Sequence, residues 1–293
     1  MTAENTKEIS KIFDNIVTTL KKNHINNPEN ESKIIISYAS GKKNFNFISE
    51  TDLNIDKINF IVEKRLEGKP LAKIINQKGF WNDVFYTNED TLDPRADSEI
   101  LVESILDDYG LMKMKNFYFI DLCSGTGCLG LSLLGELSNS HCLFIDISHE
   151  ALKVNKINSN QLNLDKRSTF LVSDLLSDSS LKLNNIEFIV SNPPYIKSLD
   201  IKKLNFETLH DPLLSLDGGA DGCDFYRSII LQLKNLKYKG CLYLEIDPIV
   251  KDIVIKLVLD NGANILYIKQ DYLKNDRLIK ITFLNSFIEL NKR

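Results

Sequence analysis

Residues 119–133 read FIDLCSGTGCLGLSL. Apolar residues run up to an acidic residue, a glycine-containing loop follows, and a helix-like segment begins near Thr126. Gly125, Gly127 and Gly130 match the spacing G-x-G-x-x-G, which turns a strand into a helix around a nucleotide. The stretch therefore predicts the first strand, loop and helix of a nucleotide-binding sheet.

Strand-like and helix-like segments alternate from about residue 97 onward. The strand-like segments are 117–122, 141–146, 168–173, 187–191, 241–246, 265–270 and one near 278–284. Near-continuous apolar strands separated by helices are typical of a parallel sheet that is covered on both faces. The pattern predicts an α/β fold with a doubly wound, mostly parallel sheet of seven strands over residues 97–293.

The N-terminal part has a different pattern. Apolar residues recur at helical spacing in 9–20, 29–40 and 54–66, and Gly68 stands where a helix would end. Aromatic and β-branched residues then come in short bursts, which is typical of a β-hairpin. We expect a small helical bundle domain over 1–76, joined by a β-hairpin linker over 77–96.

Composition excludes several classes of protein. The 293 residues carry a net charge of −4, and no basic stripe argues for direct contact with nucleic acid. No apolar run reaches the roughly 20 residues of a membrane span. Five scattered cysteines and four histidines show no metal-ligand spacing, so no metal site is expected. The N-terminus has no signal-peptide pattern, so a cytoplasmic location is expected.

Two cofactors fit the glycine loop. By the dinucleotide rule, Asp146 at the end of the next strand would bind a ribose hydroxyl of a nicotinamide or flavin nucleotide. S-adenosylmethionine also offers a ribose, but it has no pyrophosphate. Asp121, directly before the loop, would repel a pyrophosphate and attract a sulfonium or amino group. Asp174 follows the third strand, where an adenine edge would lie, and the set favours S-adenosylmethionine.

A second motif, Asn192-Pro193-Pro194-Tyr195, ends the fourth strand at the same sheet edge. The nitrogen of a planar amide or aromatic amine is a poor nucleophile because its lone pair is delocalised. The Asn192 side-chain carbonyl and a prolyl backbone carbonyl can accept the two N–H groups, and the prolines hold that carbonyl in place. The ring of Tyr195 offers a flat face to the planar group. The tetrapeptide is therefore interpreted as an amino-group clamp that faces a methyl donor.

With both motifs present, the chain resembles the protein-(glutamine-N5) methyltransferases that act on peptide chain release factors. The resemblance spans nearly the whole chain and is carried by GKPLAKIINQKGFW (68–81), TLDPRADSE (91–99), DLCSGTG (121–127), DISHEALKVNKIN (146–158), SDLLS (173–177), VSNPPYI (190–196), DPLLSLDGGADGCDFYRSI (211–229) and DYLKNDR (271–277). Cys123 stands where the family has glycine, and Leu175 stands where an aromatic residue is common. The segment DGGADG (217–222) reads as a flexible turn.

The resemblance implies a Rossmann-like methyltransferase fold and methylation of the glutamine side-chain amide in a Gly-Gly-Gln loop of class 1 release factors. S-adenosylmethionine would be converted to S-adenosylhomocysteine, and the N-terminal helices would help to hold the release factor. Asn192, Pro193 and Tyr195 are the expected catalytic residues, and Pro194 joins them in binding substrate. The expected cofactor-binding residues are Asp121, Cys123, Ser124, Gly125, Thr126, Gly127, Asp146, Asp174, Leu175 and Asn192. We expect a cytoplasmic monomer without a metal, a membrane or nucleic acid as partner.

Four other functions remain open at this point. The same tetrapeptide occurs in enzymes that methylate nucleic-acid bases, and a glutamine of a ribosomal protein is another possible acceptor. A module that binds S-adenosylmethionine without catalysis is disfavoured because the tetrapeptide is intact. A nicotinamide-dependent dehydrogenase is disfavoured because no catalytic histidine or Tyr-Lys pair is evident near the sheet edge.

Overall fold

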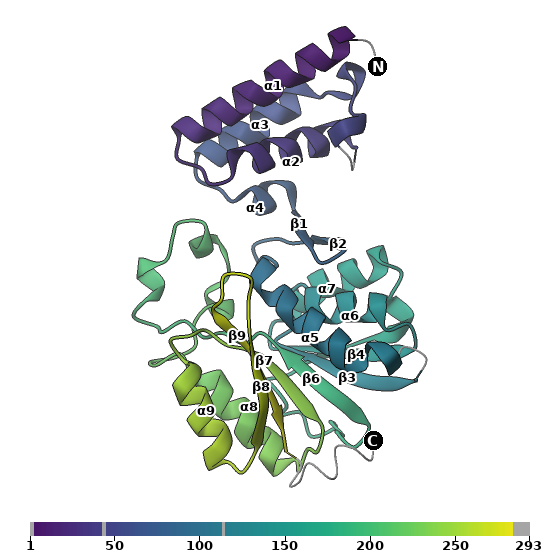
Figure 1. Ribbon diagram of the computed structural model, residues 1–293, viewed down its shortest axis with the longest axis vertical. Coiled ribbons are helices and arrows are strands. Elements are labelled where there is room, and N and C mark those ends of the chain that lie inside the picture. The colour runs from purple at the N-terminus through teal and green to yellow at the C-terminus, as the bar shows by residue number, and fades with distance from the viewer. Residues whose placement is uncertain (1–2, 43–44, 113–114, 284–293) are drawn as a thin grey trace. The chain divides into compact units, whose positions relative to one another are not determined.

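The computed structural model describes residues 3–42, 45–112 and 115–283. The chain separates into two compact units, Met1–Asn76 and Gln77–Arg293. Figure 1 shows helices alone in the first unit and a sheet with helices in the second.

The described residues of the first unit contain four α-helices. They are α1 (Ala3–Lys22), α2 (Pro28–Ser40), α3 (Ile55–Leu66) and α4 (Leu71–Ile75). Ile16, Leu20, Ile36 and Ile61 belong to one buried apolar cluster, as the helical spacing predicts. Gly68 follows α3 with φ of 95°, a left-handed conformation that glycine adopts without steric strain.

The second unit begins with an antiparallel hairpin. Strand β1 (Gln77–Phe80) pairs with β2 (Asp83–Tyr86) across a two-residue turn that begins at Trp81. Trp81 has φ of 54°, as the first position of such a turn requires. The prediction of a hairpin in this region is confirmed.

A seven-stranded sheet follows, in the order β5-β4-β3-β6-β7-β9-β8. Its strands are β3 (Phe117–Leu122), β4 (Ser140–Asp146), β5 (Ser168–Val172), β6 (Ile186–Ser191), β7 (Cys241–Glu245), β8 (Asn264–Gln270) and β9 (Asp276–Thr282). Only β9 runs antiparallel to its two neighbours. The predicted doubly wound, mostly parallel α/β sheet is confirmed, although Leu284 of the last predicted strand lies outside the described residues.

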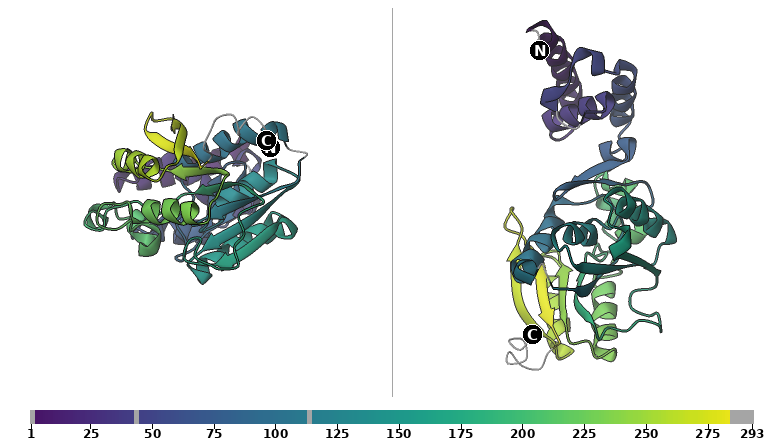
Figure 2. Two further views of the ribbon diagram at one scale, coloured as in Figure 1. Left: turned by 90° about the horizontal axis from the view of Figure 1, so that it is seen from below. Right: turned by 90° about the vertical axis from the view of Figure 1, so that its right-hand side faces the viewer.

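Helices cover both faces of the sheet, as two views in Figure 2 show. They are α5 (Glu99–Tyr109), α6 (Cys128–Glu136), α7 (His149–Gln161), α8 (Asp224–Asn235) and α9 (Lys251–Asp260). Side chains of α5, α6 and α7 share one buried cluster with Phe119 and Phe188, whereas those of α8 and α9 share another with Ile120 and Ile189. The two clusters alternate along β3 and β6 because successive side chains of a strand point to opposite faces.

The strand order reverses beside β3, because the chain runs from β3 outward to β4 and β5 and then returns to β6 on the other side. Ligands of open α/β sheets bind at the carboxyl ends of the strands, next to such a reversal. The glycine loop after β3 and the tetrapeptide after β6 therefore flank the expected position of a ligand.

Candidate active site

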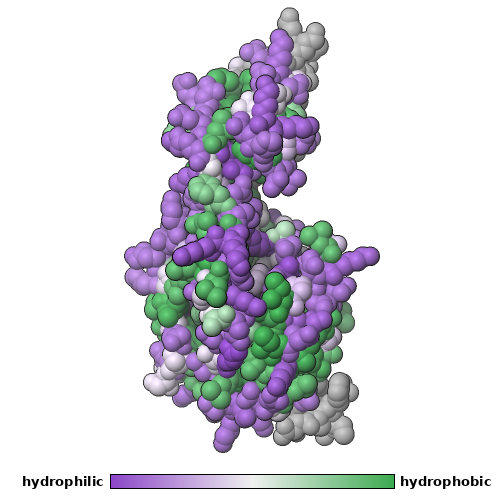
Figure 3. Space-filling view, turned by 90° about the vertical axis from the view of Figure 1, so that its left-hand side faces the viewer, coloured by the Kyte–Doolittle hydropathy of each residue, from purple (hydrophilic) through white to green (hydrophobic). Residues whose placement is uncertain are grey.

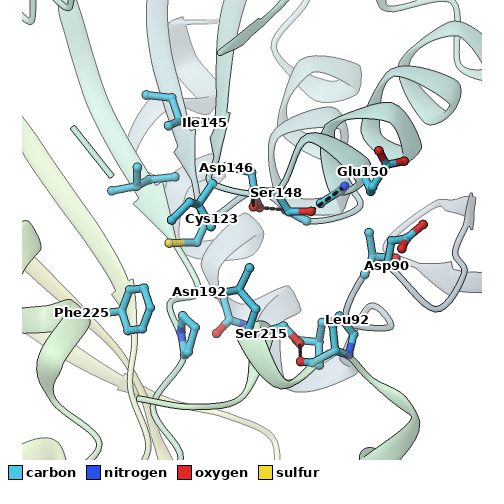
Figure 4. Close-up of a pocket in the computed structure, with 18 of the residues that line it drawn as sticks. Asp90, Leu92, Cys123, Ile145, Asp146, Ser148, Glu150, Asn192, Ser215 and Phe225 are labelled. Carbon is cyan, nitrogen blue, oxygen red and sulfur yellow. Dashed lines mark hydrogen bonds between the residues drawn. The ribbon is translucent and has the colours of Figure 1, made fainter. Parts of the chain in front are cut away.

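A cavity of about 270 Å³ lies at the carboxyl ends of these strands. Figure 4 shows Cys123, Asp146 and Asn192 around it, from three different strand ends. The predicted site residues that line this cavity are Cys123, Gly125, Asp146, Asp174, Leu175, Asn192 and Pro194. The structure thus brings the glycine loop, two acidic strand ends and the tetrapeptide together around one space.

Asp146 connects β4 to the glycine loop. One carboxylate oxygen accepts the Gly125 N–H and the other accepts the Ser148 N–H, both at 2.9 Å. Burial raises the pKa of Asp146, and these backbone hydrogen bonds oppose the shift. Ser148 caps α7 by accepting the Ala151 N–H at 3.1 Å. Asp146 therefore shapes the loop, and its free lone pairs stay available to a ligand that enters the cavity.

Asp121 does not line the cavity. Its carboxylate accepts the Gly130 N–H at 2.9 Å and is fully buried, which raises its pKa well above the ordinary value. A Cβ added at Gly130 would lie 2.9 Å from this carboxylate, so the helix approaches closely because that residue is glycine. Strand alternation turns Asp121 toward α6, and direct contact with the cofactor stays a prediction.

The remaining loop residues pack against α7 rather than line the cavity. Asn155 donates a hydrogen bond to the Ser124 hydroxyl at 3.2 Å, and Asn158 donates to the Thr126 carbonyl at 2.9 Å. Gly127 has φ of 78°, and a Cβ there would lie 2.2 Å from the Asn155 side chain. These contacts set the path of the loop and leave a cofactor role for Ser124, Thr126 and Gly127 as a prediction.

The loop after β5 forms another wall. Asp174 and Leu175 line the cavity, and Leu175 has φ of 51°. Ser173 also lines it, and its buried hydroxyl has no hydrogen-bond partner among the described residues. Cys123 has φ of 59°, so the backbone takes a left-handed turn despite the side chain. Burial raises the pKa of the Cys123 thiol, which keeps the sulfur neutral.

The tetrapeptide is connected to a buried acid that sequence reasoning missed. Asn192 donates through Nδ2 to the Ser98 hydroxyl at 3.1 Å, and Ser98 donates to Glu245 at the end of β7. The Tyr195 hydroxyl lies 3.4 Å from the other Glu245 oxygen. Pro193 and Tyr195 adjoin the lining residues Asn192 and Pro194 in the chain but do not line the cavity themselves. The sequence offered one sign of this residue: Glu245 is the single acidic residue at the end of the otherwise apolar segment 241–246.

The segment 217–222 does turn, since Gly222 donates its N–H to Gly219 at 3.3 Å, and its first residues are also hydrogen-bonded to the chain after the tetrapeptide. Gly218 donates its N–H to Ile196 at 2.8 Å, and Ile196 donates to Leu216 at 3.0 Å. A Cβ added at Gly218 would lie 2.7 Å from Tyr195 Cα, and one at Gly222 would lie 2.4 Å from the Tyr195 carbonyl oxygen. The glycines let this segment press directly on the tetrapeptide backbone and hold it in place.

Other parts of the cavity wall come from loops that carried no periodic pattern. They are Glu89, Asp90, Thr91 and Leu92 after the hairpin, Pro212, Leu214 and Ser215, and Phe225 of α8. Arg95 and Asp211 form an ion pair that joins the first of these loops to the second. Several of these residues fall within the family motifs quoted above, although none had been assigned a role.

Neither a metal cluster nor a membrane-spanning helix is found in the part of the chain that the structure describes. No cluster of His, Cys, Asp and Glu within 3–42, 45–112 and 115–283 has three members placed to hold a metal ion. In the same residues, no helix combines the length and apolar character needed to cross a membrane.

Known proteins share this sequence and fold. The family described as Methyltransferase small domain matches residues 84–210. The release factor glutamine methyltransferase of Buchnera aphidicola is 33% identical over 264 residues, which cover 88% of this chain and 93% of that protein. The bifunctional methyltransferase of Rickettsia prowazekii is 31% identical over 94% of this chain, and the chain spans 58% of that protein's length.

A solved structure supports the fold. The hMettl16 catalytic domain, in complex with a MAT2A 3'UTR hairpin, superimposes with a TM-score of 0.52 at 15% identity. The match covers 68% of this chain and 75% of that one.

The release factor glutamine methyltransferase of Clostridium acetobutylicum is 30% identical, over 85% of this chain and 89% of its own length. Similarity over nearly the full length of such relatives confirms the resemblance: this chain belongs to the release factor glutamine methyltransferase family.

Proposed function

We propose that this chain transfers a methyl group from S-adenosylmethionine to the side-chain amide nitrogen of the glutamine in the Gly-Gly-Gln motif of class 1 peptide chain release factors. The observation that carries the proposal is the Asn192 amide, which borders the cavity and is held by a hydrogen bond on its NH₂ side. The names of the relatives that match along their full length support the same acceptor.

The cavity suits S-adenosylmethionine, which supplies an electrophilic methyl group when bound. Ser173 contributes an unpartnered buried hydroxyl, and such groups normally have a partner when a site is filled. Asp146 offers a carboxylate to ribose hydroxyls, and Asp174 and Leu175 border the same space for an adenine ring. The product would be S-adenosylhomocysteine, and no metal is required.

The clamp acts on the acceptor amide. Asn192 Oδ1 and the Pro193 backbone carbonyl would accept the two amide hydrogens, so that the nitrogen lone pair can point out of the amide plane. These dipoles are fixed in advance and need little reorganisation as charge develops on nitrogen. Tyr195 would contribute its ring face to the planar amide. Because the proton can leave after methyl transfer, no strong base is needed.

Replacing Asp146 by alanine is expected to weaken binding of S-adenosylhomocysteine. The lost charge-assisted hydrogen bonds are worth about 1.5–3 kcal/mol, or roughly ten- to a hundredfold in affinity. Isothermal titration calorimetry measures the effect. The unfolding midpoint of the variant is measured beside it, because Asp146 also accepts the Gly125 and Ser148 N–H groups. A folded Asp146→Ala protein with wild-type affinity would contradict the assignment.

The proposed reaction is tested by mass spectrometry. A recombinant class 1 release factor incubated with the protein and S-adenosylmethionine should gain one methyl, located on the Gly-Gly-Gln glutamine by fragmentation. A release factor carrying Gly-Gly-Asn is the control and should stay unmodified. Parallel incubations with ribosomal proteins and with nucleic acid test the other acceptors. Methylation of one of those alone would replace the proposed substrate.

The release factor is expected to bind through both units. The second unit exposes large apolar side chains, including Leu199, Leu213, Tyr272 and Leu273. Figure 3 shows hydrophobic side chains gathered on the surface of this unit. Exposed apolar groups favour a protein partner over the phosphates of nucleic acid, and the net charge of −4 does so too. A cytoplasmic location and a monomeric state remain predictions.

Deleting residues 1–76 is expected to spare S-adenosylhomocysteine binding while strongly reducing methylation of intact release factor. The first unit has its own apolar core, so the sheet does not depend on it for folding. Methylation of a short Gly-Gly-Gln peptide should fall less than methylation of the intact release factor, because the peptide cannot contact the first unit. The measurement compares kcat/KM for both substrates. Equal losses for peptide and protein would show that the helices only support the fold.

A further inference from the structure

Four side chains form a hydrogen-bonded series behind the cavity. Asn192 Nδ2 donates to Ser98 Oγ at 3.1 Å, Ser98 donates to Glu245 Oε2, and Tyr195 lies 3.4 Å from Glu245 Oε1. Ser98 is 2% exposed and Glu245 is 1% exposed, so neither exchanges these partners with water. The series comes from three places in the chain: the entry to α5, the end of β6 and the end of β7.

The order of donors in this series has a direct consequence for Asn192. A serine hydroxyl has one proton, and Ser98 uses it on the carboxylate of Glu245. Its oxygen can then only accept from Asn192, which selects the NH₂ side of the amide. The carbonyl side, Oδ1, is left for the cavity that Asn192 borders. A clamp that accepts an N–H needs this orientation. In the opposite orientation, the Asn192 NH₂ group would face the N–H of the substrate amide, and both groups are donors.

We propose that Glu245 and Ser98 are positioning residues, and that the ionised carboxylate of Glu245 sets the amide orientation of Asn192 through the Ser98 hydroxyl. The proposal rests on the proposed function, because it concerns the acceptor that the substrate amide meets. Neither residue would touch substrate; both act through Asn192.

The groups around Glu245 make its ionisation responsive to pH. Burial raises the pKa of Glu245 to about 7, while the Ser98 hydrogen bond and the Arg277 guanidinium on β9 oppose the shift, and Asp97 adds to it. Arg277 lies 3.6 Å from Asp97 and 3.7 Å from Asp247, so its charge is shared.

Two phenols and the Cys128 thiol also interact with Glu245, and burial raises the pKa of each of them, so all three stay neutral. Tyr226 on α8 donates to the Glu245 backbone carbonyl at 2.9 Å, and Tyr195 faces the carboxylate. Once protonated, Glu245 can donate to Ser98, which frees the serine proton for Asn192 Oδ1. Protonation therefore reverses the series and turns the NH₂ group of Asn192 toward the substrate.

The test uses the full-length protein, saturating S-adenosylmethionine and a Gly-Gly-Gln peptide. Ser98→Ala should lower the single-turnover rate by about tenfold to a hundredfold, since a misoriented reacting group has effects of that size. Ser98→Thr keeps the hydroxyl and should restore most of the rate. Ser104→Ala is the matched control, because Ser104 is a buried α5 serine whose hydroxyl has no partner among the described residues. It should leave the rate unchanged.

The pH profile separates positioning from support of the fold. The wild-type rate should fall as pH decreases through about 7, whereas Glu245→Gln should be slow and flat over the same range. S-adenosylhomocysteine affinity and the unfolding midpoint report on folding for every variant. Wild-type rates in folded Ser98→Ala and Glu245→Gln would overturn the proposal. If the wild-type protein itself methylates no release factor, the proposed function fails instead.

Discussion

Replacing Asn192 by alanine is expected to lower the single-turnover rate of glutamine methylation by about 10²–10³, far more than it lowers S-adenosylhomocysteine affinity. Loss of one preorganised hydrogen-bond acceptor at a reacting group corresponds to about 2.7–4 kcal/mol. The change removes Oδ1, which would accept one amide hydrogen, and removes the donor to Ser98, which keeps its hydrogen bond to Glu245. The cofactor walls formed by Asp146 and Leu175 are not altered.

Companion variants sharpen this result. Asn192→Asp keeps an acceptor but adds a negative charge and cannot donate to Ser98, so its turnover should also fall far more than its cofactor affinity. Tyr195→Phe should be mild, since the 3.4 Å contact to Glu245 is long and the ring remains. Tyr195→Ala should be severe. A near wild-type rate for Asn192→Ala, measured by rapid quench and mass spectrometry, would reduce the tetrapeptide to a turn.

Replacing Glu245 by glutamine is expected to stabilise the folded protein at alkaline pH, by about 3 kcal/mol at about pH 8. Folding moves the pKa of this carboxyl from 4.5 to about 7, and a difference of that size corresponds to about 3 kcal/mol. The physical cause is burial, which penalises the ionised form more than the Ser98 hydrogen bond and Arg277 favour it.

The sign of this effect follows from proton binding. Between pH 4.5 and about 7 the folded state holds the Glu245 proton while the unfolded state has released it, so stability falls as pH rises through this window. Glutamine stays neutral at every pH, so the Glu245→Gln variant does not lose stability in this window. The measured quantity is the difference in free energy of unfolding between Glu245→Gln and wild type, from urea titrations at several pH values. It should grow from about pH 5 to about pH 8 and then level off. A difference that does not change with pH would show that Glu245 has an ordinary pKa.

The strand segments were the most predictable part of the fold. Runs such as 117–122 and 187–191 are apolar on both faces, because helices cover both faces of the sheet. Their observed ends agree with the predicted ends to within a residue or two. Helix α4 was not predicted, since its five residues are too few to show a helical period.

The site was predictable where it sits directly on strand ends. Asp146, Asp174 and Asn192 border the cavity because parallel strands end at a common edge. Asp121 also lies near a strand end, but side-chain alternation turns it toward α6. Its position next to the glycine loop in the sequence does not show which way the side chain points. Glu245 was missed because its partner Ser98 is distant in sequence, and only the fold brings them together.

The contact between segment 217–222 and Tyr195 limits how far the tetrapeptide can be treated as a portable module. Because Gly218 and Gly222 touch its backbone, the tetrapeptide takes its shape partly from a segment that follows it by more than twenty positions. A chimaera that carries Asn192–Tyr195 onto another methyltransferase sheet would bring the right side chains with an unsupported backbone. Transplanting the two segments together, with both glycines kept, is the smallest exchange that preserves the clamp as a unit.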